Sequence, residues 1–152
     1  MIHFKRGNIF NCDCEAVVNP VNTVGVMGKG LALQFKRAYP EMYMDYLCAC
    51  NTRDLMIGKV HVWKVNDGLE FSYIINFPTK NDWRNPSKLS YIEGGMIDLC
   101  RVIKKHNIHS IAIPALGCGL GGLDWIEVKN LMFNILTEML DDSHYILIYE
   151  PN

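Results

Sequence analysis

The fold is decided by a strand that runs directly into a glycine-rich loop and then a helix, residues 16–31, AVVNPVNTVGVMGKGL. Residues 16–19 suit a short strand, and the apolar spacing over residues 29–39 predicts a helix that Pro40 ends. The three glycines let backbone N–H groups approach a phosphate, while the helix directs its positive end to the same place. The loop is neither a Walker loop nor a G-x-G-x-x-G turn, and glycines that merely form a tight turn are its alternative explanation.

A second strand, loop and helix of the same kind occupies residues 110–125, SIAIPALGCGLGGLDW. Residues 110–114 predict a buried strand, and Asp124 starts a helix in which Glu127 completes a capping-box-like pair. Four glycines within six loop positions are costly in backbone entropy unless a ligand must approach closely. Two such loops on one sheet can clamp opposite sides of a diphosphate. A single glycine loop is weak evidence for phosphate binding, and the pair is stronger evidence.

The rest of the chain alternates strands and helices. The pattern predicts strands over residues 2–6, 59–65, 70–77 and 145–149, and helices over residues 41–50 and 87–106, the second capped by Ser87. Asn66-Asp67-Gly68 is typical of a hairpin turn. We therefore expect an α/β fold with a mixed, largely parallel sheet covered by helices on both faces. Ligands of such sheets bind beyond the carboxyl ends of the strands, where both glycine loops lie.

A third segment of chemical interest, residues 76–84, NFPTKNDWR, also follows a strand. Lys80 in this segment has two possible roles. It is either a positive charge that is solvated or contacts a phosphate, or a group that takes part in catalysis. Trp83 and Arg84 offer a stacking surface and a cation, the combination that holds an unstacked nucleic-acid base. Trp83 also suits a hydrophobic lid or a core position, and the sequence leaves that choice open.

Two asparagines, Asn19 and Asn22, lie at the end of the second strand. Their carboxamides can hydrogen-bond ribose hydroxyls without adding charge beside a diphosphate, or can cap the loop. We favour Asn22 as the ribose contact because it lies nearer the glycine turn.

Composition places the chain among ordinary globular proteins. It has 152 residues, 49% of them apolar and 20% charged, with a net charge of −1. This balance argues against broad electrostatic coating of duplex DNA, although it allows a local contact to a short nucleic-acid segment. No apolar run is long enough to span a bilayer, and the N-terminus lacks a signal-like apolar region, so we expect a cytoplasmic protein with no membrane partner.

The six cysteines include two C-x-C pairs, Cys12 with Cys14 and Cys48 with Cys50. This is not the usual spacing of zinc ligands, and the five histidines are scattered. The sequence therefore predicts reduced thiols and no metal site.

The chain resembles the macrodomains of the DarG family, antitoxins that are paired with DNA ADP-ribosyltransferase toxins of the DarT type. The resemblance rests on AVVNPVNTVGVMGKGLALQFK, NFPTKNDWR and IAIPALGCGLGGLDW, which follow one another across nearly the whole chain. It implies a three-layer α/β/α macrodomain over residues 1–152. The implied activity is hydrolysis of the N-glycosidic link between ADP-ribose and thymine in single-stranded DNA, without a cofactor. A DarT-type toxin is the implied protein partner, and we expect a monomer.

The resemblance also implies roles for individual residues. Lys80 and Asn22 would be the catalytic pair, with Asn22 on the distal ribose, and Trp83 and Arg84 would contact DNA. The remaining contacts to ADP-ribose would come from Asn8, Ile9, Asn19, Thr23, Gly25, Val26, Met27, Gly28, Lys29, Gly30, Leu31, Gly117, Cys118, Gly119, Leu120, Gly121 and Tyr149.

Three departures from related patterns bear on these roles. Asn8 stands where many macrodomains carry an acidic residue in a G-D-I segment, so its contact to adenine would be neutral. Gly121 stands where the related terminal ADP-ribose glycohydrolase has an aspartate, so Lys80 would act without that carboxylate. A further C-terminal domain, usual in the family, does not follow, which suggests an excised or orphan domain.

Two chemical roles for Lys80 stay open at this point. A neutral amine could attack C1″ of the distal ribose or trap its ring-opened aldehyde, and a protonated amine could stabilise the departing thymine. Two other functions also stay open: an ADP-ribose-binding domain without catalysis, and a hydrolase of ADP-ribose linked to Glu or Asp side chains. A nucleotide-dependent oxidoreductase fits less well, because the acidic ribose-binding residue and its fingerprint are missing.

Overall fold

The computed structural model describes residues 1–66 and 71–152 and contains one six-stranded sheet in the order β1-β6-β5-β2-β4-β3. Strand β3 pairs antiparallel with β4, and the other pairs are parallel. The elements are β1 (Ile2–Lys5), η1 (Ile9–Asn11), β2 (Ala16–Asn22), α1 (Gly30–Ala38), α2 (Pro40–Thr52), β3 (His61–Lys64), β4 (Tyr73–Lys80), α3 (Leu89–Lys105), β5 (Ser110–Ile113), η2 (Gly119–Gly121), α4 (Trp125–Met139) and β6 (Tyr145–Tyr149).

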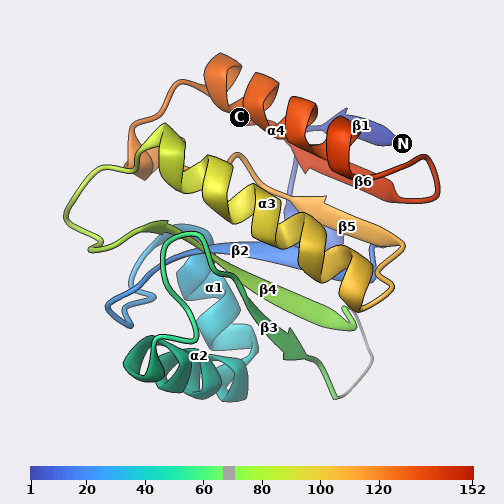
Figure 1. The fold of residues 1–152 in the computed structure, drawn as a ribbon. Coiled ribbons are helices and arrows are strands. Elements are labelled where there is room, and N and C mark those ends of the chain that lie inside the picture. The colour runs from blue at the N-terminus through green and yellow to red at the C-terminus, as the bar shows by residue number, and fades with distance from the viewer. Residues whose placement is uncertain (67–70) are drawn as a thin grey trace.

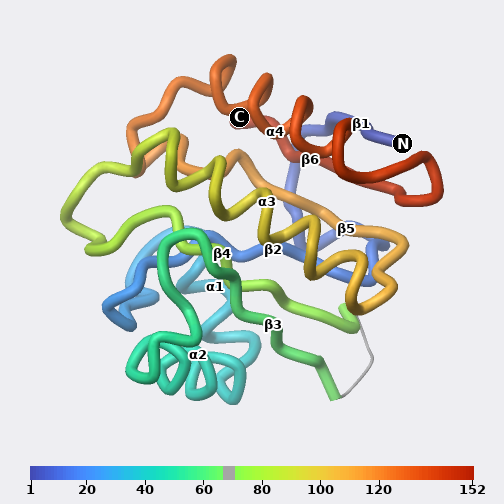
Figure 2. The backbone as a smooth tube through the Cα atoms, viewed as in Figure 1, coloured from blue at the N-terminus to red at the C-terminus, as the bar shows by residue number. Residues whose placement is uncertain are grey.

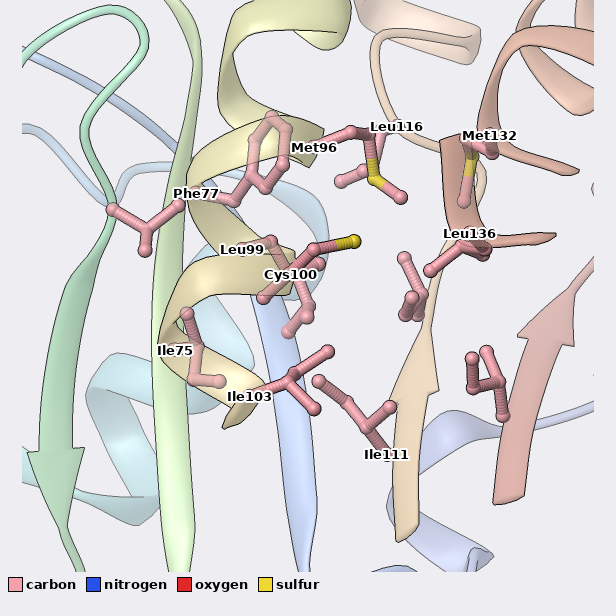
Figure 3. Packing of buried hydrophobic residues seen from close by; sticks show 14 of the residues in the cluster. Ile75, Phe77, Met96, Leu99, Cys100, Ile103, Ile111, Leu116, Met132 and Leu136 are labelled. Atoms are coloured by element: carbon pink, nitrogen blue, oxygen red, sulfur yellow. The ribbon is translucent and has the colours of Figure 1, made fainter. Parts of the chain in front are cut away.

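Helices cover both faces of the sheet, which gives the three layers that the sequence predicts (Figure 1). Helices α3 and α4 pack on one face, over a core that includes Ile75, Leu99 and Met132 (Figure 3). Helices α1 and α2 pack on the other face, where Phe35 and Tyr46 are fully buried. Each face therefore has its own hydrophobic core, and the sheet between them is held rigidly.

Close packing sets the position of α3 against β4. A Cβ atom at Gly95 of α3 would lie only 2.2 Å from the ring of Phe77 in β4, so the helix can approach this far only because residue 95 is glycine. Figure 3 shows the Phe77 ring directed at α3. This contact supports the strand that ends at Lys80.

Strands β2 and β4 both extend further than the sequence predicts. The second strand was expected to end at residue 19, yet β2 continues to Asn22. The strand predicted over residues 70–77 was expected to give way to a loop at residue 78, yet β4 continues to Lys80. The two strands keep pairing with each other past Pro20 and Pro78, because proline retains its carbonyl acceptor and tolerates extended backbone at a strand end. The prediction failed because this pairing is a long-range property.

The helix caps follow the sequence in one case and not in the other. Asp124 caps α4, accepting a hydrogen bond from the Glu127 N–H at 3.3 Å, as predicted. Ser87 does not cap α3, which begins at Leu89; the buried Ser87 hydroxyl donates instead to the Thr79 carbonyl at 2.5 Å. The antiparallel pairing of β3 with β4 confirms the predicted hairpin strands. Most of the predicted turn, at Asp67-Gly68, lies outside the described residues.

Candidate functional site

A cavity of about 830 Å³ lies at the carboxyl ends of the parallel strands. The three segments singled out in the sequence meet there, as Figure 2 shows for the loops that follow β2, β4 and β5. Thirteen of the predicted site residues line the cavity: Asn22, Val26, Gly28, Lys29, Gly30, Leu31, Lys80, Trp83, Arg84, Gly117, Cys118, Leu120 and Gly121.

The other predicted residues do not line the cavity. Asn8 caps η1 by accepting from the Phe10 N–H at 3.0 Å, and Asn19 is buried and donates to Asn76 Oδ1 at 3.0 Å. Three others are buried in the core beneath α1 and α2: Ile9, Met27 and Tyr149. The rest belong to the loops themselves: Thr23, Gly25 and Gly119.

The cavity also contains residues that the sequence reasoning missed. They are Pro20, Val21, Ala32, Thr79, Pro114 and Ala115. Most of them are the last residues of a strand or the first after it, so the rule that ligands bind beyond strand ends could have found them. The glycines predict the loops themselves, but they carry no information about these flanking positions.

The first glycine loop is organised by the side chain of Asn22, which is only 6% exposed. Asn22 Nδ2 donates to the Val26 carbonyl at 2.7 Å, and Asn22 Oδ1 accepts from the N–H groups of Val24 and Val26, each at 3.2 Å. The Tyr46 hydroxyl lies 2.7 Å from the Asn22 carbonyl oxygen. Asn22 thus caps the loop, which is one of the two roles that the sequence left open, and it also lines the cavity, where its contact to ribose stays a prediction.

The end of β2 is joined to the Lys80 segment. A register shift between Val21 and Asn22 brings Asn22 opposite Lys80 in the pairing of β2 with β4. Beyond it, the Thr23 N–H and hydroxyl both donate to the Asn81 carbonyl, at 3.1 and 2.9 Å. The first glycine loop is therefore hydrogen-bonded to the residue that follows the lysine.

The second glycine loop is held to the same strand through Ser87. The Gly121 carbonyl accepts from the Ser87 N–H at 2.9 Å, and the Ser87 hydroxyl reaches the Thr79 carbonyl. Gly117 has a φ of +75°, and a Cβ atom there would lie 2.6 Å from Leu123 Cδ1. Glycine at 117 is therefore required by the fold of the loop itself.

The Lys80 amine lies where the two segments meet. Its Nζ is 3.3 Å from the Leu120 carbonyl oxygen and 3.4 Å from the Trp83 carbonyl oxygen. These long bonds to two carbonyls hold the amine at the cavity wall. They occupy two of its hydrogens and leave a third position, an N–H or a lone pair, for a bound molecule.

Arg84 and Asp82 form a paired unit beside Trp83. Arg84 Nε and Nη2 lie 3.0 and 2.9 Å from the two carboxylate oxygens of Asp82, and this arginine lowers the pKa of the Asp82 carboxyl. The Arg84 guanidinium also lies over the Trp83 ring, 5.2 Å from its centroid. Trp83 is 48% exposed at the cavity mouth, so it is not a core residue.

The first turn of α1 suits an anion. No side chain caps this helix at Lys29, and its first turn carries no acidic residue. Gly30, Leu31 and Ala32, whose N–H groups have no partner within the helix, line the cavity. The positive end of the helix and these N–H groups together have the chemistry that phosphate binding needs.

Two further observations concern metal ligands and membrane-spanning helices. Within residues 1–66 and 71–152, no three His, Cys, Asp or Glu side chains come close enough to hold a metal ion, and the six cysteines are free. Over the same ranges, no helix is both long and apolar enough to cross a membrane.

The fold and the cavity define a class: an α/β/α domain whose parallel strands end at a cleft between two glycine loops. The family model of the Macro domain matches residues 18–132, and the chain belongs to this family. The macrodomain fold predicted from the sequence is thereby confirmed.

Solved structures narrow the likeness to one group of macrodomains. The "Macrodomain of Mycobacterium tuberculosis DarG" has a TM-score of 0.95 at 48% identity, covering 100% of this chain and 99% of that chain. "Thermosipho africanus DarTG in complex with ADP-ribose" has a TM-score of 0.92 at 37% identity, covering 99% of this chain and 41% of that chain. The resemblance to DarG macrodomains is confirmed.

Curated relatives extend the comparison to full-length proteins. The "DNA ADP-ribosyl glycohydrolase" of Mycobacterium tuberculosis is 49% identical over 152 residues, which is 100% of this chain and 43% of the relative. The protein of the same name from Thermus aquaticus is 46% identical over 151 residues, 99% of this chain and 41% of the relative. The chain therefore spans less than half the length of these relatives.

Proposed function

We propose that this domain binds ADP-ribose in the glycine-loop cavity and hydrolyses its N-glycosidic link to thymine in single-stranded DNA. In that role it would be the antitoxin of a DNA ADP-ribosyltransferase. The proposal is carried by the Lys80 amine, 3.3 Å from the Leu120 carbonyl oxygen and 3.4 Å from that of Trp83, between the two segments that line the cavity. The name shared by the relatives, DNA ADP-ribosyl glycohydrolase, supports the same activity.

The diphosphate is the part of the ligand for which the cavity is best suited. The N–H groups at the start of α1 and the backbone of the second loop face the same space, and neither requires a cofactor. With the diphosphate between the loops, the distal ribose would lie near Asn22 and Lys80, which are paired across β2 and β4. The adenine would lie toward Asn8, Ile9 and Tyr149, at the other end.

The reaction breaks the bond between C1″ of the distal ribose and a thymine nitrogen, adding hydroxide to C1″ and a proton to thymine. In one route Lys80 is protonated and stabilises the negative charge on the departing thymine. In the other route a neutral Lys80 attacks C1″ and displaces thymine, which takes up a proton; the sugar ring of the lysine adduct then opens to a Schiff base, which water hydrolyses to release ADP-ribose and the amine. Both routes use the one free position on Nζ.

The test is turnover by Lys80→Ala on an ADP-ribosylated thymidine oligonucleotide. We expect release of ADP-ribose to fall to background while calorimetry shows that free ADP-ribose still binds, because the amine lies at the wall and not in the phosphate site. Lys105→Ala, a lysine on the exposed end of α3, is the control and should retain turnover. An active Lys80→Ala protein would overturn the catalytic role.

The same assay separates the two other functions. A wild-type protein that binds ADP-ribose but releases none from DNA or from Glu- or Asp-linked peptides would be a binding domain. Release from peptides alone would make it a protein hydrolase. Reduction with cyanoborohydride during turnover distinguishes the two routes, because only the nucleophilic route leaves a stable adduct on Lys80 in the mass spectrum.

A further inference from the structure

We propose that Leu120 and Trp83 form the two sides of an apolar slot above Lys80, and that this slot selects an aromatic base as the group attached to the distal ribose. This inference rests on the proposed function and specifies its substrate class. Leu120 would be the specificity-determining residue on the side of the second glycine loop. Trp83 would be its counterpart on the Lys80 segment.

The position of the slot follows from the contacts of Lys80. The amine hydrogen-bonds to the backbone carbonyls of these same two residues, at 3.3 Å for Leu120 and 3.4 Å for Trp83. Both residues line the cavity, and they come from loops that follow different strands. A group bonded to the sugar carbon that faces Lys80 would therefore lie beside both side chains.

Leu120 has no evident structural task. It is 72% exposed and belongs to neither of the two hydrophobic cores of the described chain. Its neighbours Gly119, Gly121 and Gly122 have no side chains, so the Leu120 side chain is the one apolar projection in this part of the loop. Within residues 1–66 and 71–152, its backbone carbonyl accepts a hydrogen bond from Lys80 Nζ. A large apolar side chain placed at a cavity in this way is suited to contact a ligand.

Trp83 is exposed but held in place. Arg84 lies over its ring, and Asp82 fixes the Arg84 guanidinium through two hydrogen bonds. A planar surface that is already ordered loses little conformational freedom when a base stacks on it. Arg84 would thus support the stacking surface, in addition to any contact it makes with DNA.

The chemistry of the slot favours a nucleobase over an acidic side chain. Stacking of a base on an aromatic side chain strengthens binding by about 5- to 150-fold, and an apolar wall on the other side adds contact with its second face. An ester-linked Glu or Asp group has no aromatic face and would gain little from either side. The slot would therefore discriminate between the two substrate classes at the group that leaves.

Binding in a Lys80→Ala background tests the slot without depending on turnover. We expect an ADP-ribosylated thymidine oligonucleotide to bind more tightly than free ADP-ribose. Adding Leu120→Ala or Trp83→Ala should remove most of this excess, about 5-fold or more for Trp83, so that the oligonucleotide loses more affinity than free ADP-ribose does. Trp83→Phe and Leu120→Met should restore it. Ile126→Ala, 67% exposed on α4, is the matched control and should have no effect.

Turnover provides the second measurement. With an active Lys80, both variants should lower kcat/KM on the thymine-linked substrate by a larger factor than on any Glu-linked peptide that is cleaved. The inference is overturned if free ADP-ribose loses as much affinity as the oligonucleotide, or if neither variant changes either substrate. A wild type without turnover that still shows the binding excess would overturn the proposed function alone.

Discussion

The Asn22 side-chain amide donates to the Val26 carbonyl at 2.7 Å, across the turn of the first glycine loop. The side-chain oxygen of Asn22, Oδ1, accepts hydrogen bonds from the N–H groups of Val24 and Val26, each at 3.2 Å. The Asn22 side chain therefore makes three hydrogen bonds to the backbone of the loop, and it also lines the cavity. The shape of the loop and part of the cavity wall depend on the same residue.

Asn22→Ala should weaken ADP-ribose binding by roughly 10-fold or more, because buried hydrogen-bonding groups that lose their partner cost about 1–3 kcal/mol. Calorimetric titration with ADP-ribose measures the loss. Tyr46→Phe removes only the hydroxyl that reaches the Asn22 backbone carbonyl and should weaken binding less. Wild-type affinity in Asn22→Ala would show that the loop keeps its shape without this side chain.

Gly117→Ala should destabilise the protein more than Gly122→Ala. Both glycines have a positive φ, +75° and +80°, which costs alanine about 1–2 kcal/mol, but only the Cβ at 117 would meet other atoms, with Leu123 Cδ1 2.6 Å away. Urea denaturation compares the two free energies of unfolding. Equal losses of unfolding free energy in the two variants would mean that Leu123 moves aside for the new Cβ atom at little cost.

Ser87→Ala should lower kcat more than it weakens ADP-ribose binding. The change removes the hydroxyl bonded to the carbonyl of Thr79, the residue before Lys80, and a displacement of about 1 Å can cost up to about 100-fold in rate. Steady-state kinetics with calorimetry on the same protein measures both effects. Thr137→Ala, which removes a comparable hydroxyl-to-carbonyl bond on exposed α4, should leave kcat unchanged.

Cys12 should be alkylated at neutral pH well before Cys118. A hydrogen bond from Cys14 lowers the pKa of Cys12 to about 7, whereas burial raises the pKa of Cys118 to about 11. Since the thiolate reacts, the iodoacetamide rate at Cys12 should rise with pH and level off above 7, while that at Cys118 continues to rise toward 11. Peptide mass spectrometry follows both sites, and Cys14→Ala should move the Cys12 midpoint upward.

Local sequence patterns predicted the elements better than their ends. Strand β6, Tyr145–Tyr149, has its predicted bounds, and Asp124 caps α4 as predicted. Both features depend on interactions between residues only a few positions apart in the sequence. The ends of β2 and β4 were missed because each strand extends along the other, through contacts between residues more than fifty positions apart.

The sequence by itself predicted that two glycine loops and Lys80 lie at the carboxyl ends of strands of one sheet, and so at one edge of it. That conclusion needs only the alternation of elements and the conformational freedom of glycine, which are local properties. The tertiary structure alone decided that the Lys80 amine lies against the Leu120 carbonyl, 40 positions away, and that Ser87 connects the Lys80 strand to the second loop and does not cap a helix. Such contacts depend on how distant segments pack together, and no spacing of residues along the chain specifies them.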